Sequence, residues 1–498
     1  MNFSYTPDRR STVLLRFPDR FGLLYDERFH AGILFLNAIG EIVWPVLKQH
    51  NKTKSQHHEQ DEPKKAPQER HANRLTRPDM AINTGPTEDN VLNDMAKLPS
   101  YLPMRVPLLD LSEQYRALGD SIREGTNDVL ASGCFILGPK VKAFEKAMCA
   151  YCDTPHAIGV SSGTDALLAI LMTLGIGHGD AVITTPYTFF ATAGCIARVG
   201  ARPLFADIDP ETYNIRPSAI QECIEQNCQR DTDGTWKTRS GERVRAMIPV
   251  HLFGLCCEMD TLLEIAERYR LDVIEDAAQA IGAEFPFSKR IARAGTMGKI
   301  GLFSFYPSKN LGAAGDAGMV ICGDEKLAEN LRTFREHGMQ PRYFHHVVGG
   351  NFRLDEIQAA ILAVKLPYLE KWAAARRTAA DLYGAEFGRA GLTQRISTPC
   401  EPYRNCGLTN HHVYHQYVIR APMRDALREH LGKREIQTAI YYPLALHEQK
   451  CFVYLGYKKG DFPESERAAC ETLALPIYPE ISREAQRYVV DSIAAFYS

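Results

Sequence analysis

Short apolar runs alternate with longer amphipathic stretches from about residue 104 to the C-terminus. The stretch from Met259 to Arg270 carries apolar residues at helical spacing. The apolar runs typical of buried strands are residues 180–185, 203–207, 246–250 and 272–275. Strands that alternate with helices form mostly parallel sheets with helices on both faces. The pattern therefore predicts an α/β fold, with a large domain over residues 104–371.

A second, smaller α/β domain is predicted over residues 372–498. Apolar residues at Leu354, Ile357 and Ile361 indicate a long helix that leads into it, and Pro367 predicts a kink or break in that helix. Residues 415–420 form an apolar run and are predicted to be a strand of the small domain. Earlier in the chain, the polar segment 231–241 predicts a surface hairpin.

The first 103 residues differ in character from the rest. Residues 1–48 carry apolar patterning that suggests a small unit of strands and a helix, whereas residues 49–103 are polar and read as a disordered linker. This extension is either a partner-docking module or upstream sequence joined by a misplaced start. We favour the second reading, because Met104 stands just before the point where the alternating apolar and amphipathic pattern begins.

Composition is that of a soluble enzyme. The chain has 498 residues, 45% of them hydrophobic and 24% charged, with a formal net charge of -2. This balance gives no reason to expect a nucleic-acid or membrane partner. The thirteen cysteines are scattered, which favours a reducing, cytoplasmic location. Cys149 and Cys152 form one C-x-x-C without a second pair, so we expect core thiols and no metal site.

A lysine and an aspartate stand at the ends of two apolar runs. Lys309 follows the run 300–305, and Asp276 ends the run 273–276. Burial disfavours the ammonium form of a lysine and frees a nucleophilic amine. Pyridoxal phosphate needs such an amine for its aldehyde and a carboxylate to keep its ring nitrogen protonated. Taken singly, Lys309 could be solvated, and Asp276 could cap a helix that begins at Ala277.

A helix start offers a place for a phosphate group. Residues 157–160 read as a short strand, and Ser161-Ser-Gly-Thr-Asp-Ala166 leads directly into an apolar helix. Glycine permits close approach of the backbone, and the free N–H groups of the helix start suit an anion. Such helix starts also occur without any ligand.

Several motifs in order resemble the DegT/StrS family of pyridoxal-phosphate-dependent nucleotide-sugar aminotransferases. They are residues 106–111, 132–138, 161–167, 249–254, 274–279, 304–310, 350–356 and 475–479. The resemblance covers about residue 106 to the C-terminus. It implies the fold type I architecture of PLP-dependent transferases, with a mostly parallel large-domain sheet and a smaller α/β domain.

The resemblance also implies roles for individual residues. Lys309 matches the Schiff-base lysine, Asp276 the partner of the ring nitrogen and Gln279 the residue beside the ring hydroxyl. The residues that match the phosphate cradle are Gly163, Thr164 and Ser304. Phe189 falls where relatives place an aromatic ring over the cofactor, although it could equally be a core residue, and Phe190 competes for that role.

Other implied roles concern the partner subunit and the substrate. Asn351 matches an asparagine that reaches the cofactor phosphate of the neighbouring subunit, which implies a homodimer with shared active sites; otherwise it is a turn residue. Tyr442 and His447 match a region near the substrate. Arg353 or Arg420 could neutralise a carboxylate or a diphosphate.

The implied reaction moves an amino group from L-glutamate to a keto-sugar nucleotide, for surface-polysaccharide or glycoside biosynthesis. Two alternatives remain. One is a PLP-dependent sugar dehydratase, in which histidine replaces the lysine; the presence of Lys309 disfavours it. The other is a catalytically silent regulatory protein on the same fold, which the intact set of cofactor residues disfavours.

Overall fold

The computed structural model describes residues 12–16, 22–26, 34–35, 104–288 and 290–498. The chain divides into two units, residues 1–95 and 96–498. In the first unit, β1 (Thr12–Arg16) pairs antiparallel with β2 (Gly22–Asp26), which pairs with β3 (Leu34–Phe35). The predicted helix of residues 1–48 and the predicted linker 49–103 lie outside the described residues.

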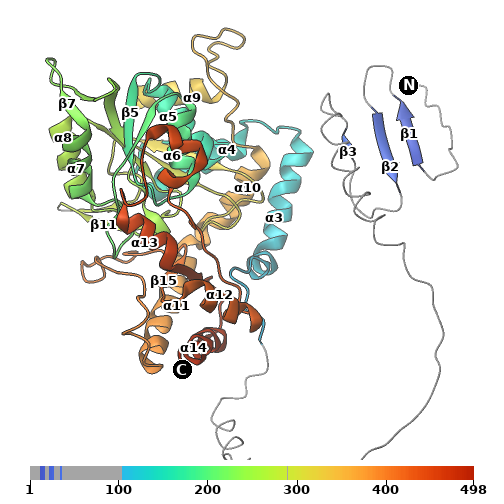
Figure 1. The fold of residues 1–498 in the computed structure, drawn as a ribbon. Helices are drawn as coiled ribbons and strands as arrows, with labels where there is room; N and C mark the ends of the chain where they lie inside the picture. Colours follow the sequence, from blue (N-terminus) through green and yellow to red (C-terminus); the bar gives the residue numbers. More distant parts are fainter. Residues whose placement is uncertain (1–11, 17–21, 27–33, 36–103, 289) are drawn as a thin grey trace, which may run out of the picture. The chain divides into compact units, whose positions relative to one another are not determined.

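The second unit is built on one large, mostly parallel sheet (Figure 1). Its central strands run in the order β4-β14-β13-β10-β9-β5-β6. They are β4 (His156–Val160), β5 (Asp180–Thr184), β6 (Arg202–Phe205), β9 (Arg243–Met247), β10 (Asp272–Asp276), β13 (Ile300–Ser304) and β14 (Gly318–Cys322). Of these, β14 runs antiparallel to both of its neighbours. The predicted α/β class is confirmed.

Helices cover both faces of this sheet, as strands buried on both sides require. On one face lie α4 (Pro139–Cys152), α7 (Pro217–Asn227), α8 (Met259–Tyr269) and α10 (Glu356–Lys365), the last packed also on α3 (Ser112–Ser132). On the other face lie α5 (Gly163–Thr173), α6 (Phe190–Arg198) and α9 (Glu325–Arg335). Successive residues of β10 show the burial on both sides. Val273 lies in the hydrophobic core under the first group of helices, and Ile274 lies in the core under the second group.

The large domain also contains two antiparallel hairpins outside the central strand order. The predicted hairpin is confirmed, because β7 (Cys228–Arg230) pairs antiparallel with β8 (Trp236–Thr238). A second hairpin joins β11 (Glu284–Phe287) to β12 (Arg290–Arg293).

The C-terminal part has a hydrophobic core of its own, separate from the two cores of the large sheet, and it contains a small antiparallel sheet. The break predicted at Pro367 is confirmed, since α10 ends there in the turn η2 (Leu366–Tyr368) before α11 (Leu369–Arg389) begins. Strand β15 (Tyr417–Arg420) pairs with β16 (Thr472–Leu475). The remaining elements are η1 (Leu252–Gly254), α12 (Arg424–Lys433), η3 (Leu446–Glu448), η4 (Lys450–Leu455), α13 (Pro463–Glu471) and α14 (Arg483–Tyr497). Within the described ranges, no helix has the length and apolar character needed to cross a bilayer.

Asp207 ties the small-domain elements to the large sheet. This buried carboxylate follows β6 and accepts hydrogen bonds from the backbone N–H groups of Glu464 and Ser465, each at 2.9 Å. The Ser465 hydroxyl donates a third, at 2.6 Å. Because these N–H groups open α13, Asp207 acts as that helix's N-terminal cap across the domain boundary.

Candidate active site

The ends of three neighbouring strands bring the predicted phosphate cradle together. Ser304 ends β13 and pairs with Gly318 of β14, which pairs in turn with Val160 at the end of β4. A Cβ added at Gly163 would lie 2.8 Å from the Ser304 Cβ, so the backbone at the start of α5 approaches Ser304 as closely as only glycine allows. The first N–H groups of α5 have no partner within the helix, and the dipole favours an anion there.

Asp276 is buried and held at the end of β10. Its Oδ2 accepts a hydrogen bond from the Thr192 hydroxyl at 2.9 Å, and its Oδ1 accepts the N–H of Ala278 at 3.2 Å. Burial raises the pKa of Asp276, whereas these two hydrogen bonds and the nearby Lys309 work in the opposite direction. The helix-cap alternative is wrong: residues 277–283 form turns, and no helix begins at Ala277.

Lys309 lies in the loop after β13, within electrostatic reach of Asp276. Its backbone N–H donates to the carbonyl of Tyr306 at 2.8 Å. The side chain keeps a partial opening, but the surrounding protein removes most of its hydration. This desolvation lowers the pKa of Lys309 to about 8, although attraction to Asp276 opposes the shift. The shift has the direction that a nucleophilic amine at position 309 would require.

Gln279 is fixed at both ends of its amide. The backbone N–H of Phe253 donates to Oε1 at 2.7 Å, and Nε2 donates to the hydroxyl of Tyr442 at 2.9 Å. Both Gln279 and Tyr442 are buried. The structure therefore brings Tyr442 to the site, where it contacts Gln279 instead of lining an open surface.

The two competing phenylalanines occupy different places. Phe190 opens α6, and its ring lies 5.7 Å from that of Phe452 in the small domain. Phe189 precedes the helix and is 61% exposed. Phe190 is 47% exposed although it packs on Phe452, so Phe189 is the more open of the two rings and the geometry favours it as the ring available to a cofactor.

Asn351 lies in the segment that runs beside the end of β4, where the backbone N–H of Ser161 donates to the carbonyl of Phe352 at 3.0 Å. It is exposed, and its backbone forms an isolated bridge with Glu336. Arg353, two residues on, pairs with Val160 near the start of α5, and its buried Nε has no hydrogen-bond partner in the described part of the chain.

His447 lies in η3 and is held by a carboxylate and an aromatic ring. Its side chain is fully buried, its Nε2 lies 3.1 Å from Glu466 Oε1, and its ring packs 4.7 Å from Phe462. The buried Nδ1 of His447 has no hydrogen-bond partner in the described part of the chain, so a substrate contact for His447 stays a prediction.

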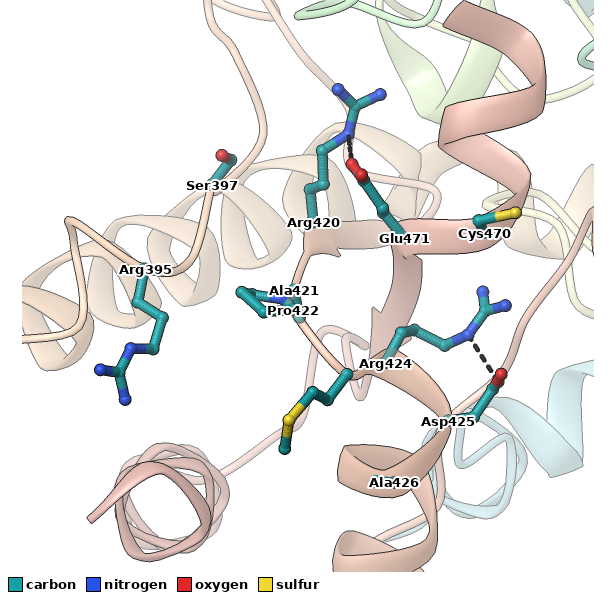
Figure 2. A pocket seen from close by; sticks show the side chains of 11 residues that line it. Arg395, Ser397, Arg420, Ala421, Pro422, Arg424, Asp425, Ala426, Cys470 and Glu471 are labelled. Carbon is teal, nitrogen blue, oxygen red and sulfur yellow. Dashed lines mark hydrogen bonds and ion pairs between the residues drawn. The ribbon is translucent and has the colours of Figure 1, made fainter. Parts of the chain in front are cut away.

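Arg420 also lies elsewhere. Figure 2 shows it paired with Glu471, with Nε 3.4 Å from Oε2, beside a shallow cavity of about 540 Å³ in the small domain. Its guanidinium lies 5.2 Å from the centre of the Tyr213 ring. None of the predicted cofactor residues lines this cavity.

Sequence reasoning missed the buried polar network around Glu275, the neighbour of Asp276 in β10. Glu275 points to the opposite face of β10 and accepts the N–H groups of Gly295 at 2.7 Å and Met297 at 2.6 Å. His251 Nε2 lies 2.9 Å from the same carboxylate, and His251 Nδ1 accepts the N–H of Cys257 at 3.0 Å. A glutamate inside an apolar strand was the available signal, because buried charge requires such partners.

The lysine, the carboxylate and the anion-binding helix start define the class of protein: a fold type I aminotransferase of the PLP-dependent kind. The DegT/DnrJ/EryC1/StrS aminotransferase family matches residues 117–494. This chain belongs to that family, whose aminotransferases depend on PLP.

Known relatives cover most of the chain. A "Pleiotropic regulatory protein" of Geobacillus stearothermophilus is 47% identical, over 79% of this chain and 99% of its own. The UDP-N-acetyl-3-dehydro-alpha-D-glucosamine 3-aminotransferase of Acidithiobacillus ferrooxidans is 38% identical, over 76% and 94%. The solved structure of Bacillus subtilis NtdA with bound cofactor PMP has a TM-score of 0.68 and 30% identity, over 79% of this chain and 85% of that one.

Proposed function

We propose that this aminotransferase binds pyridoxal phosphate and transfers an amino group from L-glutamate to a keto-sugar nucleotide. One observation carries the proposal: Lys309, with its pKa lowered to about 8, faces the buried carboxylate of Asp276 at the carboxyl ends of the parallel strands. The sugar-nucleotide part rests on the activities named for the relatives.

The residues present fit the cofactor. Gly163 allows the start of α5 to lie directly against Ser304, and this helix start supplies N–H donors for a phosphate group. Asp276 offers a carboxylate to the ring nitrogen, and Gln279 keeps an amide N–H end oriented beside it. When bound, pyridoxal phosphate supplies an electron sink for the charge that develops on the substrate carbon.

Each residue then has a separate task. Lys309 is the residue that would hold the cofactor through its aldehyde. The amine of Lys309 would also accept and return a proton at the reacting carbon, and a pKa of about 8 suits this role near neutral pH. Asp276 favours the protonated ring nitrogen, while Thr192 and Ala278 hold its carboxylate in one orientation.

The active unit is a homodimer in this proposal. Asn351 is exposed in the single chain, so its side chain is open to a partner. The preceding segment carries apolar side chains with large exposure, including Tyr343 at 73% and Val348 at 88%. Exposed apolar surface of this kind is typical of an interface. Asn351 would then complete the phosphate site of the partner.

The amino sugar made would serve surface-polysaccharide or glycoside biosynthesis in the cytoplasm. All thirteen cysteines are free, which fits a reducing compartment. Which carbon of which sugar is aminated depends on the substrate pocket, and a panel of keto-sugar nucleotides with glutamate, followed by mass, identifies it.

The test of the proposal is Lys309→Ala, with Lys326→Ala as the matched control. Lys326 is exposed and pairs only with Glu329 on α9. We expect Lys309→Ala to lose the visible absorbance of the bound cofactor and all amination of keto-sugar nucleotides, and Lys326→Ala to keep both. Retention of colour and turnover in Lys309→Ala would refute the proposal.

A regulatory role is the second candidate, because the 47% identical relative carries a regulatory name. The buried Lys309 and Asp276 argue against a silent protein, since burying two charged groups without a catalytic use is costly. A coloured protein that aminates no sugar in the panel would favour the regulatory role.

A further inference from the structure

The orientation of the Gln279 amide is set by two contacts of different kinds. The Phe253 N–H can only donate, so the atom it contacts at 2.7 Å must be the amide oxygen. The other end of the amide is therefore the NH₂ group, which contacts the Tyr442 hydroxyl at 2.9 Å. An NH₂ group has two hydrogens, and one acceptor takes only one of them.

Tyr442 belongs to a buried aromatic cluster whose other members are Tyr187, Tyr213 and Phe253. Its ring lies 6.1 Å from that of Phe253 and 5.3 Å from that of Tyr187. With 7% of its surface exposed, the ring offers little area to a sugar. Burial also raises the pKa of Tyr442, which keeps the phenol neutral.

The cluster fixes Tyr442 from both domains. Tyr187 belongs to the loop that leads to Phe189, and its hydroxyl lies 2.8 Å from that of Thr472 in β16. Tyr442 itself follows Ala439, which pairs with Ala474 of the same strand. The hydroxyl of Tyr442 is thus presented to Gln279 by the small domain, whereas Gln279 belongs to the large one.

We propose that Tyr442 is a positioning residue for the cofactor and not a substrate contact: by accepting one Nε2 hydrogen of Gln279, it leaves the second available to the ring hydroxyl oxygen of pyridoxal phosphate. This inference rests on the proposed function. Without Tyr442, the amide keeps only the contact with Phe253 at its oxygen, and its NH₂ end loses its fixed direction.

The experiment compares two Tyr→Phe variants of the same cluster in the holoenzyme. Tyr442→Phe removes the acceptor of Gln279, and Tyr187→Phe removes the contact with Thr472. The measurement is the pH midpoint of the visible absorbance of the bound cofactor. Electron density on the ring oxygen stabilises the protonated, coloured form of the cofactor. A hydrogen bond to that oxygen withdraws this density and so lowers the pH midpoint. Its weakening in Tyr442→Phe should raise the midpoint by about 0.5 to 1 pH unit, while Tyr187→Phe keeps the wild-type value.

A double-mutant cycle with Gln279→Leu separates positioning from general packing. If Tyr442 acts through Gln279, adding Tyr442→Phe to Gln279→Leu should give no further shift of the midpoint. An equal shift in both backgrounds would overturn the inference. So would an unchanged midpoint in Tyr442→Phe accompanied by a raised KM for the sugar nucleotide, because that combination marks a substrate contact.

Failure of this inference is distinguishable from failure of the proposed function. A wild-type protein that binds pyridoxal phosphate without colour, or a coloured Lys309→Ala, rejects the proposed function. A coloured wild type that loses its colour in Lys309→Ala, but has the same midpoint in Tyr442→Phe, rejects only the role of Tyr442.

Discussion

The attraction between Lys309 and Asp276 partly offsets the cost of burying each charged group. Burial lowers the pKa of the lysine to about 8 and raises that of the aspartate, and their mutual attraction works against both shifts. The sequence could predict the pair because Asp276 ends one apolar run and Lys309 follows shortly after another. It could not predict Thr192, which lies 84 positions from Asp276 and donates to it only because the fold places α6 beside β10.

The free energy of unfolding of the cofactor-free protein should depend on pH in a way that reflects the desolvation of Lys309. Below pH 8, Lys309 is charged in both the folded and the unfolded protein, so the folded state bears the full cost of its burial. Between pH 8 and the unfolded value near 10.5, the unfolded state binds a proton that the folded state lacks, and stability rises with pH. Lys309→Met removes the charge, so it should be more stable than wild type at pH 7 by about 1–3 kcal/mol.

Denaturant unfolding at pH 7 and pH 10 measures this difference. The advantage of Lys309→Met should shrink towards pH 10, whereas Lys326→Met, which changes an exposed lysine, should show no such trend. An advantage that stays constant with pH would contradict a lowered pKa of Lys309.

At the scale of elements, apolar runs predicted where strands and helices are but not where each begins. Strand β9 starts at Arg243, three residues before its apolar run, because Arg245 bonds to the carbonyl of Leu174 and pairs with Asp180. Strand β15 starts at Tyr417 instead of His415, whose ring contacts Asn310. Polar residues thus extend β9 and shorten β15. Both effects depend on partners far away in sequence, which a local pattern does not contain.

Glu356 joins two elements at the edge of the site. It opens α10 and is 1% exposed. Both of its carboxylate oxygens accept backbone N–H groups at the start of α4: Oε2 those of Gly138 and Val141, each at 3.0 Å, and Oε1 that of Lys140 at 2.5 Å. Glu356→Gln replaces a carboxylate with an amide whose NH₂ end cannot accept. We expect it to lower the free energy of unfolding by about 1–3 kcal/mol.

Chemical denaturation of Glu356→Gln and Glu325→Gln provides the comparison. Glu325 also stands in the first turn of a helix, α9, but it is exposed. A loss of the same size in both variants would show that the buried carboxylate has no special role at the start of α4.

At the scale of the whole molecule, a shared active site makes a prediction that a single chain cannot satisfy. In a symmetric dimer whose sites each combine Lys309 of one subunit with Asn351 of the other, Lys309→Ala and Asn351→Ala inactivate different halves of a site. A mixed dimer then carries both changes in one site and none in the other. Dissociating and reassociating an equal mixture of the two inactive variants should therefore restore about a quarter of the wild-type activity, since half the dimers are mixed and each has one intact site.

The recovery also has an internal control. A mixture of Lys309→Ala with Asp276→Asn should regain no activity, because these two residues lie close together in one chain and every site would keep one of the changes. Turnover measured before and after reassociation, with the dimer fraction followed by light scattering, provides the comparison. If the Lys309→Ala and Asn351→Ala mixture stays as inactive as its components while mixed dimers form, Asn351 serves its own chain and the two sites are independent.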